Sequence, residues 1–245
     1  MIVFTIIAHI ACAQPSITIQ YAYLHSPTFD KILQTYNTSR PWLEDKLHPL
    51  TNGYGGKFGW NFRIQKTHEI HLLPEIGYAR FGASADNNGK FFKVGFHDFT
   101  AQVALRMHPR SIYKPAQGAG VLGTRFYISL ATGITSFLPY SKTNGERLKW
   151  DDETTYREFS FTYQFTIAAG IQYFSIGRFI ITPEIGLTWH PTTELTDFAQ
   201  VVNGHNIVGL NNNANNVFLL NGGLRITFVK SGKNWWDRPR EGDKT

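Results

Sequence analysis

The sequence has few charged residues, one cysteine and no long uninterrupted run of apolar residues. Asp, Glu, Lys and Arg make up 17% of the 245 residues, whereas soluble domains usually contain about 25%. A single Cys excludes a fold held together by disulfides. No apolar stretch reaches the roughly 18 residues of a membrane-spanning helix, which excludes a helical membrane protein. Disorder is excluded too, because 42% hydrophobic residues supply a substantial core.

Aromatic residues are abundant, at 15% of the chain, and many of them alternate with small or polar residues. Every odd-numbered residue from Phe159 to Tyr173 is apolar, and residues 179–189 repeat this pattern. Period-two alternation is typical of a strand whose two faces meet different surroundings. Six further copies cover residues 16–25, 54–64, 68–81, 91–106, 124–137 and 216–229. The pattern predicts eight strands, each near the roughly 9–11 residues that a tilted strand needs to cross a bilayer.

The composition of the less apolar face distinguishes a membrane barrel from a soluble lipocalin-like barrel. A strand face in water is normally rich in Lys and Glu. Here that face consists mainly of Gly, Ser, Thr, Ala and Gln, which suits the narrow lumen of a small barrel. Aromatic residues also gather near strand ends, as in interfacial girdles: Tyr21, Tyr23, Tyr54, Trp60, Phe91, Phe92, Tyr173 and Trp189. We therefore predict an all-β fold, an eight-stranded antiparallel up-and-down transmembrane β-barrel.

A motif near the end of the chain points to the same class. Residues 221–228 (NGGLRITF) follow the order polar-x-Gly-x-x-hydrophobic-x-aromatic. This resembles the β-signal on the last strand of Gram-negative outer-membrane barrels, although here a polar tail follows the final aromatic. Over residues 14–229 the chain resembles the small eight-stranded barrels, similar to the transmembrane domain of outer-membrane protein A. The resemblance implies a place in the outer membrane, contact with its lipid and lipopolysaccharide, and recognition of residues 221–228 by the barrel assembly machinery.

The two ends of the chain differ from the barrel in composition. Residues 1–13 are apolar and close on Ala11-Cys12-Ala13, which predicts a secretory signal peptide cut before Gln14. Acylation of Cys12 and retention of this segment as a strand are the alternatives. Residues 230–245 are predicted to be a periplasmic polar tail.

Charge is distributed unevenly between the two sets of connections. The expected periplasmic turns are 65–67, 107–123 and 174–178, and the expected outer loops are 26–53, 82–90, 138–157 and 190–215. Basic residues without acidic ones occupy the turns and the start of the tail: Lys66, Arg110, Lys114, Arg178, Lys230 and Lys233. The net charge of +6 therefore suits anionic headgroups of the inner leaflet and does not predict nucleic-acid binding.

The first outer loop carries helical signals. Ser26 and Pro27 form an N-cap and first helical position. A second short helix is expected from Pro41, carrying Trp42, Leu43 and Leu47. The apolar residues of this loop either cap the barrel rim or form a docking surface for another outer-membrane or extracellular protein: Phe29, Ile32, Leu33, Tyr36 and Trp42.

Charged residues on the lumen face form three expected ion pairs. Pairing across a turn centred on residue 66 places Lys57 opposite Glu75 and Arg63 opposite Glu69, and depth in the membrane places Arg225 near Glu184. Structural ion pairs are favoured over an ion gate, and both over acid–base catalysis by the two carboxylates.

The sequence does not favour an enzyme. Lipid A 3-O-deacylases carry His-x-Ser on a late strand, whereas this chain has His190-Pro191-Thr192, with His190 expected to face inward as a hydrogen-bonded rim residue. His68 and His71 lie on opposite strand faces and make no metal site. We expect no cofactor, and predict a non-enzymatic outer-membrane barrel with a structural, adhesive or complex-forming role. A narrow solute pore is the first alternative, and a lipid A-modifying enzyme is the second.

Overall fold

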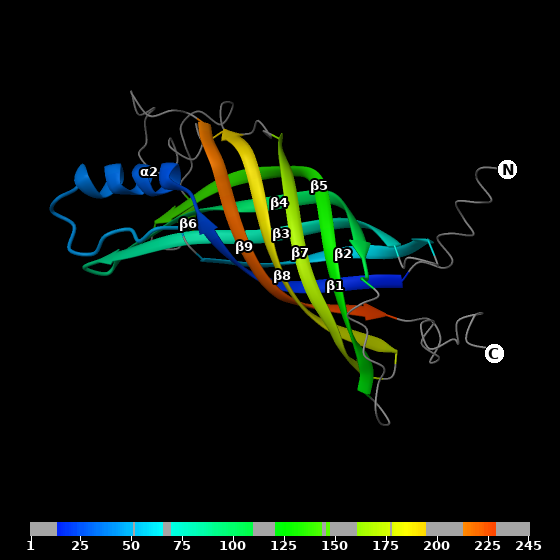
Figure 1. Ribbon diagram of the computed structural model, residues 1–245. Coiled ribbons are helices and arrows are strands. Elements are labelled where there is room, and N and C mark those ends of the chain that lie inside the picture. Colours follow the sequence, from blue (N-terminus) through cyan, green and yellow to red (C-terminus); the bar gives the residue numbers. More distant parts are fainter. Residues whose placement is uncertain are drawn as a thin grey trace, which may run out of the picture.

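The computed structural model describes residues 14–50, 52–65, 70–109, 121–143, 146–147, 161–176, 178–194 and 213–228. Within them lie one helix, eight long strands and one two-residue strand (Figure 1). The long strands are β1 (Gln14–His25), β2 (Asn52–Gln65), β3 (Ile70–Asn87), β4 (Lys90–Met107), β5 (Val121–Thr143), β7 (Phe161–Ile176), β8 (Phe179–Glu194) and β9 (Asn213–Phe228). The short elements are α2 (Pro27–Thr38) and β6 (Glu146–Arg147). The predicted signal peptide and polar tail lie outside the described residues.

The eight long strands form a closed barrel. Each pairs antiparallel with its neighbours along the chain, and β1 pairs with β9, so no long strand has a free edge within the barrel wall. Ser16 lies opposite Thr227, which places the first and last described strand ends together, away from α2 (Figure 1). The predicted eight-stranded, antiparallel up-and-down barrel is confirmed.

In the barrel wall, the predicted alternation of side chains gives each strand an inner face and an outer face. In β1, Ser16 and Thr18 are buried, whereas Ile17 and Ile19 between and beside them are 54% and 64% exposed. Large apolar side chains are exposed on every barrel strand, among them Ile19, Trp60, Ile76, Val103, Leu130, Phe165, Ile185 and Leu224. The outer wall is therefore a continuous apolar band. No helix among the described residues combines the length and apolar character needed to cross a membrane.

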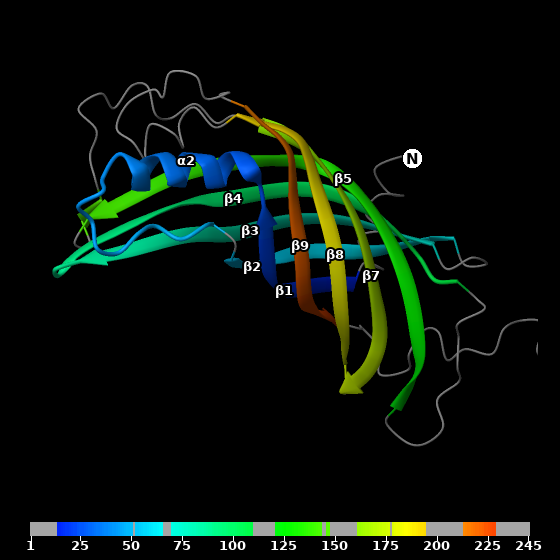
Figure 2. The ribbon, with the colours of Figure 1, turned by 60° about the vertical axis from the view of Figure 1, so that its left-hand side comes forward.

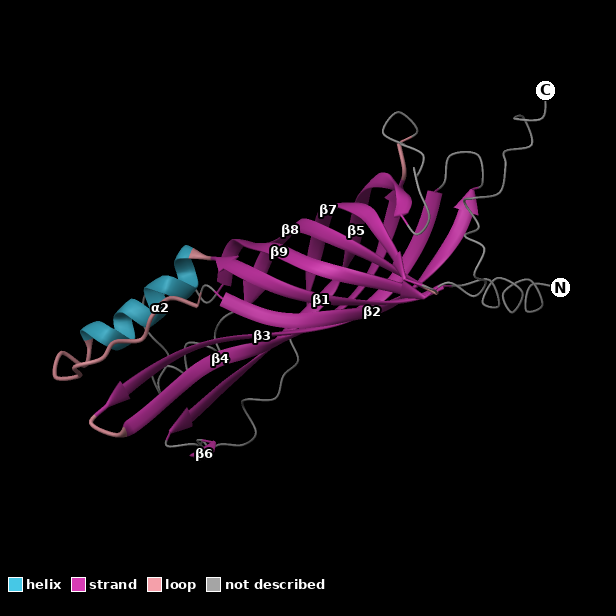
Figure 3. Ribbon diagram, turned by 90° about the horizontal axis from the view of Figure 1, so that it is seen from below, coloured by secondary structure: helices cyan, strands magenta, loops and turns pink. Residues whose placement is uncertain are grey.

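Three neighbouring strands continue beyond the rim of the others. β3 and β4 have 18 residues each and β5 has 23, against 12 in β1. Figures 2 and 3 show this extension, formed by the outer parts of β3, β4 and β5, projecting with α2 lying along it. The outer loop predicted at 82–90 is wrong, because these residues continue the β3–β4 hairpin. Asn88 and Gly89 form its two-residue turn. Their φ values are 53° and 76°, in the left-handed region that suits such a tight hairpin turn.

The first loop contains one helix rather than two. α2 begins after Ser26 with Pro27 in its first turn, as predicted. The second helix expected from Pro41 is absent, since residues 40–50 run back along α2 in an irregular path. The Asn37 amide explains this path: its Nδ2 donates to Leu47 O at 2.9 Å and its Oδ1 accepts from Leu47 N at 3.0 Å. These bonds hold the returning segment alongside the helix.

Candidate functional site: the polar core of the barrel

Arg225 of β9 is the centre of a buried charge cluster in the lumen. Its Nε donates to Glu184 Oε2 at 2.9 Å and its Nη2 donates to Glu184 Oε1 at 3.2 Å, a two-point contact with β8. Its Nη1 donates to Glu75 of β3, on the other side of the lumen. Arg225 and Glu75 are both only 4% exposed. One guanidinium therefore bridges two carboxylates from separate parts of the wall.

The remaining members of the cluster come from β4, β5 and β7. Arg106 Nη2 lies 3.6 Å from Glu184 Oε2, and its guanidinium sits 4.0 Å above the centre of the Tyr127 ring. The Tyr127 hydroxyl donates to Glu184. Gln102 Nε2 donates to Glu75 Oε2 at 2.7 Å, and Gln102 Oε1 accepts a hydrogen bond from Gln164 Nε2 at 3.0 Å. Six strands are thus joined across the lumen by charged or amide hydrogen bonds, which are strong where water is excluded.

Of the three expected ion pairs, the structure brings together Glu184 and Arg225. Lys57 lies opposite Gly77, so its expected position opposite Glu75 is wrong by two residues, although both side chains share the lumen face. Arg63 lies opposite His71 rather than Glu69, and Glu69 itself lies outside the described residues. The cause is local. Gln65 pairs with Ile70, so the connection is centred beyond residue 67 rather than on residue 66, and a bulge between Arg63 and Gln65 reverses only part of this displacement.

Several cluster residues were not singled out from the sequence. Gln102 and Arg106 occupy the less apolar face of a predicted strand, and Tyr127 and Gln164 occupy the same face of two others. The signal that could have identified them is a charged or amide side chain at a position predicted to face the lumen. An arginine there needs a carboxylate, because a buried unpaired charge is costly.

The loop residues proposed as a docking surface have a different position. Phe29, Ile32, Leu33 and Tyr36 are buried against the extension, and only Trp42 is exposed, at 72%. The Phe29 ring stacks on Phe96 at 5.2 Å between ring centres. The docking interpretation is therefore wrong for the four buried residues. They cap the inner face of the extension because that face is apolar and has no opposing strand to cover it.

His190 faces the lumen, as expected, but without the expected hydrogen bond. It is fully buried, neither ring nitrogen has a hydrogen-bond partner among the residues that the structure describes, and its ring meets the edge of Phe137 at 5.3 Å between ring centres. Thr192 is exposed. This pair has no activated nucleophile geometry. Over the described part of the chain, no three His, Cys, Asp or Glu side chains gather as a metal site.

Comparison with known proteins finds similarity in structure only. No protein-family model matches the chain, and no curated protein matches its sequence. The crystal structure of Neisserial surface protein A aligns over 88% of this chain and 96% of its own, with a TM-score of 0.46 and 9% identity. The N-terminal β-barrel domain of Pseudomonas aeruginosa OprF aligns over 88% and 99%, at a TM-score of 0.34 and 11% identity. The outer membrane protease OmpT from Escherichia coli aligns over 88% of this chain and 95% of its own, at a TM-score of 0.39 and 6% identity.

The pairing of the strands establishes the fold independently of these similarities. Eight antiparallel strands pair in chain order, and the first closes on the last. The chain is an eight-stranded up-and-down β-barrel, the fold that the resemblance to small outer-membrane barrels predicted.

Proposed function

We propose that this protein is a non-enzymatic β-barrel of the Gram-negative outer membrane with a structural, adhesive or complex-forming role. The exposed apolar band around all eight strands is the observation that carries the proposal. Soluble monomers rarely expose contiguous apolar patches above a few hundred Å². In lipid the same apolar wall is compatible with its surroundings, and closure pairs every long strand with a neighbour on both sides.

The lumen supports a structural role over a pore. The charge cluster crosses it from β3 to β8 and β9. A cavity beside Lys57 and Glu184 measures about 10 Å³, the room for roughly one water molecule. We assign the cluster the role of a plug that also ties the wall together.

The adhesive or complex-forming part of the proposal concerns the extension. It continues past the apolar band and carries the exposed Trp42 in the loop that follows α2. In the proposed orientation it projects outward from the cell, while the ends of β1 and β9 face the periplasm. Residues 221–228 in β9 are then available to the assembly machinery during insertion.

Insertion into lipid tests the membrane assignment. The full chain is refolded into phosphatidylcholine vesicles, and its heat-modifiable migration in gels is compared with that of two variants. Ile185→Lys places a charge on the band, where lysine near the bilayer centre costs about 2–4 kcal/mol. We expect it to impair insertion, whereas Gln34→Lys, on the exposed side of α2, should insert like wild type.

Two results would contradict the proposal. Equal insertion by Ile185→Lys and Gln34→Lys would mean that the band does not face lipid. Steady single-channel conductance by wild-type protein in planar bilayers would favour the pore.

A further inference from the structure

The outer face of the extension carries cations directly above the apolar band. Tyr78 and Phe99 end the band on β3 and β4, and they lie opposite each other in the pairing. One step farther out, Arg80 lies opposite His97, and the Tyr78 hydroxyl is 2.7 Å from His97 Nδ1. Aromatic residues at the edge of such a band mark the level of the lipid headgroups. Arg80 is therefore placed at headgroup height.

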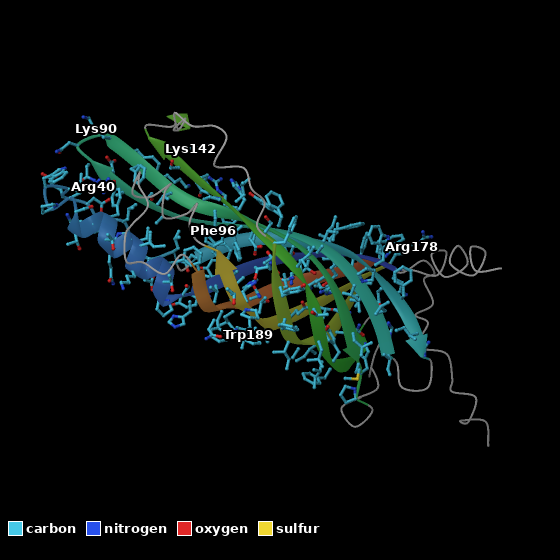
Figure 4. All side chains as sticks on the ribbon, turned by 90° about the horizontal axis from the view of Figure 1, so that it is seen from above. Arg40, Lys90, Phe96, Lys142, Arg178 and Trp189 are labelled. Carbon is cyan, nitrogen blue, oxygen red and sulfur yellow. The ribbon has the colours of Figure 1, made fainter. Side chains whose placement is uncertain are left out.

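Two lysines complete the cationic group. Lys93 of β4 lies directly opposite Lys142 of β5, and both are partly exposed on the outer face. Like charges directly opposite each other destabilise a sheet. The ion pairs among the described residues lie in the lumen, and none includes Arg80, Lys93 or Lys142. Asp86, the outward acid on β3, lies farther toward the hairpin tip. Figure 4 shows Lys142 toward the outer end of the extension, far from Arg178.

The outer surface of the extension between these cations is closely packed. Gly82 and Gly95 lie opposite each other on the outer face, and Gly95 lies opposite Tyr140. The Tyr140 side chain covers these glycines and is only 5% exposed despite facing outward. A Cβ at Gly82 would come within 2.6 Å of the Tyr140 hydroxyl, so the glycine permits this close packing.

Tyr140 in turn positions Arg80. Its hydroxyl donates to Phe81 O at 3.2 Å and accepts a hydrogen bond from Arg80 Nε at 3.2 Å. The guanidinium also lies 4.9 Å from the centre of the Tyr140 ring. Arg80 is thus held on the wall beside Tyr54, its pairing partner on β2, and a guanidinium presents a fork of donors that suits phosphate.

An apolar groove lies immediately below this group. It has a volume of about 700 Å³, and its lining includes Ile17, Ile19, Ile76, Tyr78 and Phe99. Tyr78 and Phe99 therefore border both the groove and the cations. An apolar groove beneath a cationic edge complements a molecule with acyl chains and a phosphorylated head.

We infer that Arg80, Lys93 and Lys142 bind the phosphate groups of a phosphorylated glycolipid of the outer leaflet, whose acyl chains occupy the groove. This inference rests on the proposed membrane location and adds to it a defined lipid site. The wall would then carry one tightly held lipid, in addition to the ordinary lipid around the band.

Native mass spectrometry of the refolded full chain in detergent tests the site, with bisphosphorylated lipid A as the probe. We expect one molecule to bind wild type. Lys93→Ser/Lys142→Ser should weaken binding roughly 30-fold, since it removes two of the cations that attract the phosphates. The control Lys31→Ser/Lys46→Ser removes the same charge from the α2 side of the extension, and should bind like wild type. Arg80→Gln provides a second, independent test of the same site.

Two further probes identify the source of the phosphate. Lipid A without phosphates should bind at least about tenfold more weakly than the bisphosphorylated form. Soluble glucosamine 1-phosphate should bind far more weakly than the lipid, because it leaves the groove empty. Equal binding of either probe, or unchanged binding by both Lys93→Ser/Lys142→Ser and Arg80→Gln, overturns the inference.

Insertion into vesicles of phosphatidylcholine alone separates this inference from the proposed function. Failure of wild type to insert there contradicts the membrane location. Normal insertion without selective lipid A binding contradicts only the lipid site.

Discussion

The inner faces of β3 and β4 are polar in the closed barrel and apolar in the extension. Within the barrel, Glu75 and Gln102 lie opposite each other and join a charge cluster. Farther along the same strands, Phe81 lies opposite Phe96 and both are buried in an apolar cluster. Figure 2 shows the reason for the change, since only the barrel part faces other strands across a lumen. Opposed strands bring polar partners together, whereas an open wall must be covered by an apolar loop.

The largest expected effect tests the polar half of this comparison. Arg225→Met leaves Glu75 and Glu184 without their shared cation, and breaking a buried ion pair typically costs about 3–5 kcal/mol. We expect a large fall in the urea midpoint of unfolding in vesicles. Because the arginine serves two carboxylates, Glu184→Gln/Arg225→Met should recover only part of the loss, and adding Glu75→Gln should recover most of it.

The same set of variants shows whether the cluster acts as a unit. Additive losses in the triple variant would mean that the three side chains do not share one interaction. The single variants should also show brief conductance steps in planar bilayers, absent from wild type, because they loosen the plug.

For the apolar contact between α2 and the extension, we expect a loss of stability of nearly the same size, confined to that region. Phe29→Ala empties a fully buried position between α2 and the Phe96 ring. Such truncations cost about 3–5 kcal/mol when the site cannot collapse. We expect faster proteolysis within residues 39–50, with unchanged heat-modifiable migration of the barrel. Gln34→Ala on the exposed side of α2 is the control, and a lowered urea midpoint of the whole barrel would show that the two regions unfold together.

A smaller effect is expected at the tip of the extension. Gly89 has φ of 76°, and a left-handed backbone costs an alanine about 1–2 kcal/mol. Gly89→Ala should increase hydrogen exchange in residues 82–95 and leave exchange in β8 and β9 unchanged. Increased exchange around Glu184 would contradict the separation of the two regions.

The smallest expected effect on stability concerns Trp42. Its side chain is 72% exposed, and substitutions at such positions usually change stability by less than about 0.5 kcal/mol. Trp42→Ala should keep the wild-type urea midpoint but reduce crosslinking of the extension to another outer-membrane protein, if that protein docks here. Crosslinking equal to wild type would exclude Trp42 from the docking surface.

Local patterns in the sequence predicted much of the wall. Period-two alternation identified all eight strands and the facing of residues such as Ile185 and Glu184, because a strand allows only two side-chain directions. Ser26 and Pro27 identified the start of α2. The position of Lys57 was wrong by two residues because the connection between β2 and β3 is centred farther along the chain than expected, and alternation is unchanged by a shift of two.

The charge cluster shows where such reasoning stopped. Glu184 and Arg225 lie on adjacent strands, β8 and β9, so their proximity followed from depth in the membrane. Glu75 and Arg225 lie on β3 and β9, which β1 and β2 separate along the wall. They touch only across the closed lumen, and no pairing of neighbouring strands predicts that contact.

The sequence alone thus determined the strands, the direction of their side chains and the apolar character of the outer wall. Each depends on interactions between residues near one another in the chain. Closure of the sheet decided which lumen charges share a partner, and the extra length of β3, β4 and β5 decided what α2 covers. The same extra strand length also placed Arg80, Lys93 and Lys142 together above one apolar groove. These arrangements depend on the relative heights and crossings of distant strands, which shear and strand length set for the barrel as a whole.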